Sequence, residues 1–121
     1  MVLVDTSIWV THLRQGSRQL EKLLMDAEVM CHPFIIGELA CGNLKNRNEI
    51  ISLLHSLPMA PPIELDEFLF FIDQNYLMGK GIGFVDVHLL ASARLNGVPL
   101  WTADKRLKSA ADQLELTVRK R

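Results

Sequence analysis

Short apolar runs alternate along the chain with longer segments in which apolar and polar positions follow a helical period. In the short runs, consecutive positions are apolar, which is typical of strands buried on both faces of a sheet. We therefore expect strands at residues 2–4, 28–32 and 98–102, and a last strand at residues 114–118.

The longer segments predict helices, because their apolar residues recur about every 3.6 positions. Gly16 ends the first helix, Pro33 precedes the third, and a proline-rich connector at residues 58–62 follows the fourth. Thr6 or Ser7 is expected to cap the first helix and Asp104 the last. The predicted helices cover residues 8–15, 18–27, 34–44, 46–57, 66–78 and 86–96, with a short one after Asp104.

This alternation of strands and helices predicts an α/β fold. Strands that are separated by helices form parallel sheets with both faces covered. With 121 residues, 49% of them hydrophobic, the chain is expected to form a single domain over residues 1–121 with one core. We predict a three-layer α/β/α architecture with a central parallel sheet, in which ligands bind at the carboxyl ends of the strands.

Net charge and cysteine content indicate which surfaces, disulfides and cellular compartment to expect. The net charge is −1, so a general basic surface for nucleic acid is not expected. A local basic cluster, interpreted as solvated, consists of Lys105, Arg106, Lys108 and residues 119–121. Cys31 and Cys41 are expected to be buried thiols and not a disulfide. No secretory signal or membrane span is recognisable, so we expect a cytoplasmic protein without a membrane contact.

The candidate chemistry lies in acidic residues beside predicted strand ends or inside apolar helices. They are Asp5, Glu38, Asp86 and Asp104. Taken singly, each has an ordinary structural explanation. Asp5 and Asp104 could cap helices, and Asp86 could lie in the first turn of a helix. Glu38 could be a solvated or partly buried helix residue. Together, converging carboxylates repel one another and require raised pKa values or bound cations. Oxygen ligands without His or Cys suit Mg²⁺ or Mn²⁺, which activate water for phosphoryl chemistry.

Other kinds of site find little support in the sequence. There is no Gly-x-Ser-x-Gly motif and no Cys-x-x-Cys pair. The glycines between positions 79 and 83 lack the order of a phosphate-binding loop, so we interpret them as a flexible approach to Asp86. The histidines show no metal spacing, and His88 is expected to pack or lie at the surface. Trp9 and Trp101 lie in apolar patterns and are expected in the core.

Four segments together resemble the PIN-domain family, and more narrowly the VapC toxins of VapBC toxin–antitoxin modules. They are VDTSIWV at the start, GELACG around Glu38, GIGFVDVHLLASA around Asp86, and LWTADKRL around Asp104. The segments occur in the family's order and reach from Val2 to Leu107. The resemblance therefore extends over nearly the whole chain.

This resemblance implies a PIN-like fold and a metal-dependent endoribonuclease. The residues that match the family's acids are Asp5, Glu38, Asp86 and Asp104. The resemblance assigns the principal Mg²⁺ or Mn²⁺ to the three aspartates, with Glu38 helping to bind a second ion or to position water. The polar residues expected to orient carboxylates or water are Thr6, Ser7 and Thr102. Metal-activated water would then hydrolyse RNA and leave a 5′-phosphate and a 3′-hydroxyl.

The resemblance also implies partners. These are an RNA substrate, a cognate VapB-like antitoxin that lies over the acidic groove, and a second copy in a homodimer, with DNA contacted only indirectly through the antitoxin. The candidates for the dimer surface are Phe34, Ile35, Ile50 and Leu54, which the sequence does not distinguish from core positions.

Three alternatives remain at this point. A phosphorylatable receiver domain has a similar length, but it needs a pair of adjacent acids after the first strand, where this chain has Asp5 followed by Thr6. A phosphatase of the haloacid-dehalogenase type needs an Asp where this chain has Ser7. A non-catalytic PIN fold that binds RNA or protein fits the motifs better, although the complete set of acids argues against it.

Overall fold

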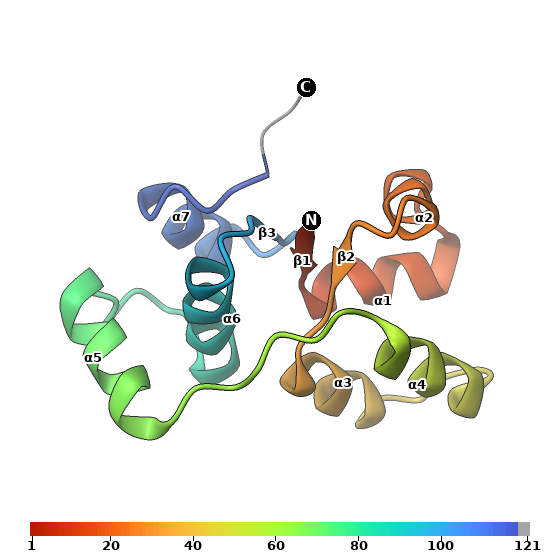
Figure 1. Cartoon of the computed structure of the whole chain (residues 1–121), viewed down its shortest axis with the longest axis horizontal. Helices are drawn as coiled ribbons and strands as arrows, with labels where there is room; N and C mark the ends of the chain where they lie inside the picture. Colours follow the sequence, from red (N-terminus) through yellow and green to blue (C-terminus); the bar gives the residue numbers. More distant parts are fainter. Residues whose placement is uncertain (119–121) are drawn as a thin grey trace.

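A parallel sheet lies at the centre of the computed structural model, which describes residues 1–118 (Figure 1). The strands are β1 (Val2–Val4), β2 (Val29–Met30) and β3 (Leu100–Trp101), in the order β2-β1-β3. Leu3 in the middle strand pairs with Met30 on one side and with Leu100 on the other. The predicted α/β class with a central parallel sheet is therefore confirmed.

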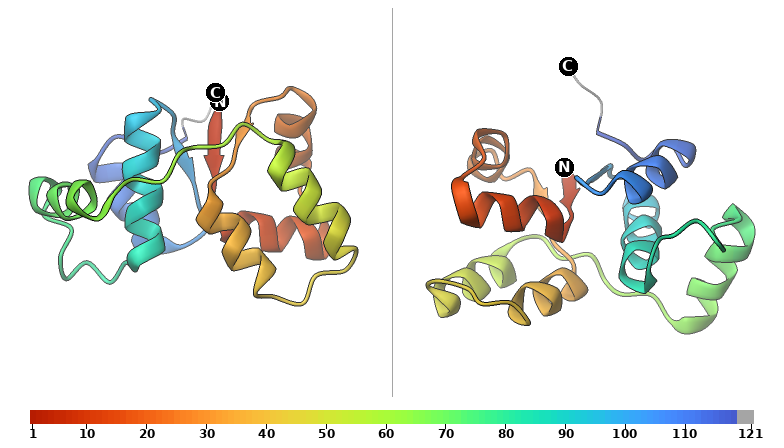
Figure 2. Two further views of the ribbon diagram at one scale, coloured as in Figure 1. Left: turned by 60° about the horizontal axis from the view of Figure 1, so that its bottom comes forward. Right: turned by 180° about the vertical axis from the view of Figure 1, so that it is seen from behind.

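Helices cover both faces of this sheet. One layer contains α1 (Thr6–Gln15), α2 (Arg18–Met25), α3 (Pro33–Ala40) and α4 (Arg47–Ser56). The other contains α5 (Leu65–Asn75), α6 (Phe84–Leu95) and α7 (Lys105–Gln113). Figure 2 shows the same separation into two helical layers from two further directions. Of the helices described, none combines the length and the apolar character needed to cross a membrane.

The strands are shorter than the hydrophobic pattern predicted. Because β1 has only 3 residues, its parallel neighbours at residues 28–32 and 98–102 pair with it over 2 residues each. Single bridges join Cys31 to Met59 and Leu100 to Thr117. The expected strand at residues 114–118 is wrong as a strand: Glu115, with a left-handed φ of 58°, turns the chain, and only one bridge remains.

Local capping sets helix ends that the apolar period does not show. α3 ends at Ala40 and not near residue 44, and the Arg47 guanidinium donates to the carbonyls of Ala40 (2.6 Å) and Gly42 (3.3 Å). These bonds satisfy carbonyl groups that a helix end leaves free. α5 ends at Asn75 and not at residue 78, because Tyr76 has a left-handed φ of 51°.

The N-cap of α1 differs from the prediction. Asp5 occupies this position, whereas Thr6 and Ser7 already belong to the helix. Their hydroxyls are used instead for hydrogen bonds between side chains, described below. The prediction for the last helix is confirmed, because the Asp104 carboxylate accepts the backbone N–H of Leu107 at 2.9 Å.

The core lies on both sides of β1. Leu3 and Val4 are completely buried, and α6 buries an unbroken run of residues from Val87 to Ala93 because it packs against both β3 and α5. Trp9 is 1% exposed, which confirms its expected core position, whereas Trp101 is only partly buried. Each fully buried large apolar side chain stabilises the fold by about 1.5–3 kcal/mol, so α6 contributes heavily to stability.

Some expectations about burial are wrong. Cys31 is buried as expected, but Cys41 is exposed because it lies just beyond the end of α3. Ile35 and Leu54, suggested for a dimer surface, are both 0% exposed and belong to the core. The basic residues at positions 119–121 of the predicted cluster lie outside the described residues.

Candidate active site

Four elements contribute the acidic residues singled out in the sequence. Asp5 follows β1 directly, and Asp104 lies at the N-cap of α7, just after β3. Because parallel strands end at the same edge of the sheet, the topology places these two acids near each other. Glu38 comes from α3, and Asp86 comes from the first turn of α6.

Asp5 is the buried member of this group. It is 5% exposed, and its backbone N–H donates to the carbonyl of Trp101 at 2.9 Å, which fixes β1 beside β3. The carboxylate Oδ2 accepts the hydroxyl of Ser7 at 2.8 Å and that of Thr102 at 2.7 Å. Within residues 1–118, Oδ1 accepts no hydrogen bond. Two donors therefore orient one oxygen and leave the other available.

The same two hydroxyls hold the loop that leads to Asp104. Thr102 Oγ1 accepts the backbone N–H of Asp104 at 3.0 Å, and Ser7 Oγ accepts the backbone N–H of Ala103 at 3.0 Å. Each hydroxyl thus donates to Asp5 and accepts from the loop. This network couples the position of the first acid to that of the last.

Glu38 is tied to the first helix. Its carboxylate Oε1 accepts the hydroxyl of Thr6 at 2.7 Å, a contact between residues on α3 and α1. The side chain of Glu38 is exposed and not partly buried. Its oxygen atoms are therefore accessible from solvent while one of them is held by Thr6.

Asp86 shows the electrostatic consequence of this arrangement. Its carboxylate Oδ2 accepts the backbone N–H of Gly83 at 3.0 Å, which fixes the side chain over the start of α6. Burial raises the pKa of Asp86, and the negative charges of Asp5 and Asp104 raise it further, whereas the N–H of Gly83 lowers it. Asp5 and Asp104 are therefore close enough to Asp86 for their charges to act on it.

The three aspartates lie near one another without forming a complete ligand set, and Glu38 is joined to this region through Thr6, the residue after Asp5. Within the part of the chain that the structure describes, no three His, Cys, Asp or Glu side chains are arranged to hold a metal ion. Glu38 and Asp104 are exposed, and each has one carboxylate oxygen that accepts a hydrogen bond, from Thr6 and from the N–H of Leu107, and one that accepts none among residues 1–118. The donor atoms are carboxylate and hydroxyl oxygens, the kind that Mg²⁺ and Mn²⁺ prefer.

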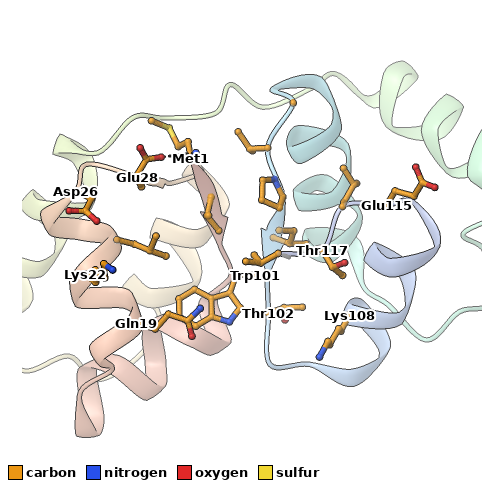
Figure 3. Close-up of a pocket in the computed structure, with 18 residues that line it drawn as sticks. Met1, Gln19, Lys22, Asp26, Glu28, Trp101, Thr102, Lys108, Glu115 and Thr117 are labelled. Atoms are coloured by element: carbon orange, nitrogen blue, oxygen red, sulfur yellow. Dashed lines mark ion pairs between the residues drawn. The ribbon is translucent and has the colours of Figure 1, made fainter. Parts of the chain in front are cut away.

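A broad hollow in the surface of the described residues lies mostly away from these acids. Figure 3 shows it between α2 and α7, with β1 and β3 between them. Its volume is about 1510 Å³, and Thr102 is the one lining residue that also belongs to the network around Asp5. Geometry and charge, and not the size of this hollow, identify the acidic cluster as the candidate site.

Two buried histidines, His32 and His88, pack against aromatic side chains. The His88 ring stacks on Phe68 with centroids 4.4 Å apart, which confirms its expected packing role. His32 is 0% exposed, and its Nδ1 accepts the backbone N–H of Phe34 at 2.9 Å. Burial lowers the pKa of His32 to about 4, with a smaller contribution from His88.

Arg106 lies closer to the candidate site than the sequence suggested, since it was interpreted as a solvated member of a basic cluster. Its side chain crosses Gly81 in the loop before α6, so closely that a Cβ on this glycine would lie 2.7 Å from Nη1. The glycines before Asp86 were the signal for this contact. Their spacing alone does not show which side chain requires the space.

Comparisons with known proteins identify the family of this chain. The PIN domain family model matches residues 2–113. The chain is similar to Ribonuclease VapC32 of Mycobacterium tuberculosis strain CDC 1551 / Oshkosh and to the protein of the same name in strain ATCC 25618 / H37Rv. In each case the identity is 47% over 111 residues, which cover 91% of this chain and 90% of the relative. The chain is therefore a VapC-like member of the PIN-domain family.

Proposed function

We propose that the chain is an endoribonuclease that uses a divalent metal ion, Mg²⁺ or Mn²⁺, at the acidic cluster. The observation that carries this proposal is the arrangement of carboxylates where the sheet ends: Asp5 is buried with one oxygen held by two hydroxyls, and Asp104 is joined to it through Thr102. Repulsion between neighbouring carboxylates is relieved when a cation binds between them. The name Ribonuclease, carried by relatives 47% identical to this chain, supports RNA as the substrate.

The residues of the acidic cluster have different proposed roles in metal binding. Asp5, Asp86 and Asp104 hold the principal ion, and Glu38 with Asp5 assists a second ion or positions a water molecule. Ser7 and Thr102 donate to Oδ2 of Asp5 and so turn Oδ1 toward the ion. Thr6 holds Oε1 of Glu38 in the same way. Glu38 and Asp104 would each offer the carboxylate oxygen that is not used by Thr6 or by the N–H of Leu107.

A bound divalent ion supplies an activated water molecule and neutralises the charge that develops on the phosphate during attack. The chain contributes a fixed direction for that attack, because hydrogen bonds hold Asp5 and Asp86 in place. Hydrolysis by water leaves a 5′-phosphate and a 3′-hydroxyl on the two RNA products.

The biological context follows from membership of the VapC-like group. We propose that the chain acts as the toxin of a toxin–antitoxin pair and that a VapB-like antitoxin covers the acidic groove. DNA would then be contacted only through the antitoxin. A homodimer would require exposed apolar residues, and α5 offers Leu65, Leu69 and Phe70.

The test uses purified protein with structured and single-stranded RNAs in Mn²⁺, Mg²⁺ or EDTA. Asp5→Asn removes a proposed ligand with little change in shape, and Asp26→Asn, at the exposed end of α2, is the matched control. We expect metal-dependent cleavage in wild type and Asp26→Asn and a loss of at least about 100-fold in Asp5→Asn. Binding of RNA without cleavage, in folded protein free of antitoxin, would instead favour the non-catalytic alternative.

A further inference from the structure

Arg106 projects from the start of α7 toward the start of α6. It is the second residue of α7, whose N-cap is Asp104. Its side chain crosses Gly81, at the near end of the loop whose far end, Gly83, donates its N–H to Asp86. The guanidinium group of Arg106 therefore lies beside the loop that leads to Asp86.

Two independent features of position 81 favour glycine: its backbone conformation and the close approach of Arg106. Its φ is +76°, a conformation that residues with a side chain rarely adopt. A Cβ at this position would also lie 2.7 Å from Nη1 and 2.8 Å from Cδ of Arg106. Gly79 has a similar φ of +72°, but a Cβ there would meet nothing within 4 Å. The close passage of Arg106 thus distinguishes Gly81 from its neighbour.

The guanidinium of Arg106 has no partner among residues 1–118. Two other arginines serve the fold: Arg47 donates to the carbonyls of Ala40 and Gly42, and Arg94 donates to the carbonyl of Leu114 at 3.1 Å. Arg106 makes no such hydrogen bond, and no carboxylate of the described chain forms an ion pair with it. Its N–H donors, which suit bidentate binding of phosphate, are therefore unused.

We propose that Arg106 binds a backbone phosphate of the RNA substrate next to the phosphate that is cleaved, and that Gly81 is required to let its side chain reach this position. This inference rests on the proposed function, because it assigns a substrate contact to the same site. A cation is needed there because the carboxylates otherwise repel the RNA backbone. Arg106 thereby positions the substrate and is not a metal ligand.

The test measures both RNA binding and cleavage. In a cleavage-inactive Asp5→Asn background, we expect Arg106→Gln to weaken binding of a short single-stranded oligoribonucleotide roughly 10-fold or more. The slope of log K against log salt should fall by about 0.7, the value for one lost phosphate contact on a single strand. With Asp5 intact, the same change should raise KM for cleavage and alter kcat little.

Matched variants separate this role from a structural one. Arg14→Gln removes the same charge from an exposed position near the end of α1 and should leave binding, KM and the salt slope unchanged. Gly81→Ala should reproduce the effect of Arg106→Gln, whereas Gly79→Ala, with similar backbone strain and open space, should not. A fall in thermal stability without a change in salt slope or KM would show that Arg106 only supports the fold, and would overturn the inference.

The remaining outcomes distinguish this inference from the proposed function. Cleavage by wild type that is unaffected by Arg106→Gln would leave the nuclease intact and reject the phosphate contact. Binding that depends on Arg106 without any cleavage would support the contact and reject the nuclease. If wild type neither binds nor cleaves any RNA tested, both are wrong.

Discussion

The Asp5 carboxylate accepts both of its hydrogen bonds on one oxygen, and this asymmetry organises the site. Ser7 and Thr102 donate to Oδ2 while they accept backbone N–H groups from the loop before Asp104. A single pair of hydroxyls thus orients the buried acid and positions the exposed one. Side chains that orient ligands in this way typically change metal affinity or activity by about 10–100-fold when removed.

Thr102→Val tests this coupling at the level of one hydroxyl. Valine has nearly the same shape but neither donates to Asp5 nor accepts from Asp104. We expect the cleavage rate at fixed Mn²⁺ to fall by about 10–100-fold, with a loss in unfolding free energy of about 1–3 kcal/mol. Thr117→Val is the control, because its side chain makes no hydrogen bond within residues 1–118. Equal activity in the two variants would show that the hydroxyl does not orient Asp5.

His32 predicts how stability responds to acid. Burial lowers the pKa of this histidine from 6.5 to about 4 in the folded state, so between these values the unfolded chain binds a proton that the folded chain does not. The contribution of His32 to stability is therefore complete above the unfolded pKa and is lost as pH falls toward the folded pKa, by up to about 3 kcal/mol.

Urea unfolding over this pH range measures the effect. We expect the unfolding free energy of wild type to fall more steeply on acidification than that of His32→Asn, which keeps an acceptor near the backbone N–H of Phe34. His55→Asn, at an exposed position on α4, controls for the removal of a histidine. The same slope in wild type and His32→Asn would contradict a buried neutral His32.

At the scale of elements, α6 connects the core to the site. Its middle is buried between β3 and α5, while its first turn carries Asp86, held by Gly83. A helix fixed by packing along its length gives the carboxylate at its start a defined position. The packing of α6 therefore helps to fix the position of Asp86 in the acidic cluster.

Leu89→Ala tests the contribution of α6 to stability. Leu89 is 0% exposed, and truncation of such a residue costs about 2–5 kcal/mol. Leu95 lies on the same helix but is 65% exposed, so Leu95→Ala should cost less than about 0.5 kcal/mol. Denaturant unfolding of both variants checks this contrast. Similar losses would mean that the middle of α6 is not packed as described.

The elements were largely predictable from the sequence, and their ends were not. Apolar runs indicated β1, β2 and β3 because burial on both sheet faces requires them. The ends depend on contacts between distant residues, such as the Arg47 side chain on the carbonyls of Ala40 and Gly42. Apolar neighbours also suggested burial of Cys41, but the early end of α3 leaves it exposed.

The sequence predicts the candidate site as a set of residues, and this set stays a prediction; the hydrogen-bond network among them could not be predicted. The acids were marked by their positions near strand ends and in apolar helices, and family motifs strengthened that choice. No local pattern predicts that Thr102 donates to Asp5 or that Arg106 passes over Gly81, because each pair is joined only by the fold. Side-chain contacts across the sheet edge therefore required the structure.

At the scale of the whole molecule, negative charge is concentrated where the sheet ends. The chain as a whole carries a net charge of only −1, so the cluster around Asp86 is a local feature. Repulsion between neighbouring carboxylates destabilises a folded protein, and a cation that binds between them relieves it.

Divalent ions should therefore stabilise the folded protein. We expect Mn²⁺ at about 100 times its Kd to raise the unfolding free energy by about 2.7 kcal/mol, seen as a higher Tm that EDTA reverses. Asp5→Asn should lose most of this shift, whereas Asp26→Asn at the end of α2 should retain it. Identical shifts in wild type and Asp5→Asn would place the bound ion elsewhere.

The chemical ends of the RNA products test the central claim most directly. Mass spectrometry of an oligoribonucleotide cleaved by the wild-type protein with Mn²⁺ identifies them. Water activated at the acidic cluster predicts a 5′-phosphate on one product and a 3′-hydroxyl on the other. A 2′,3′-cyclic phosphate would show that the RNA's own 2′-hydroxyl is the nucleophile, and would contradict hydrolysis by metal-activated water at this site.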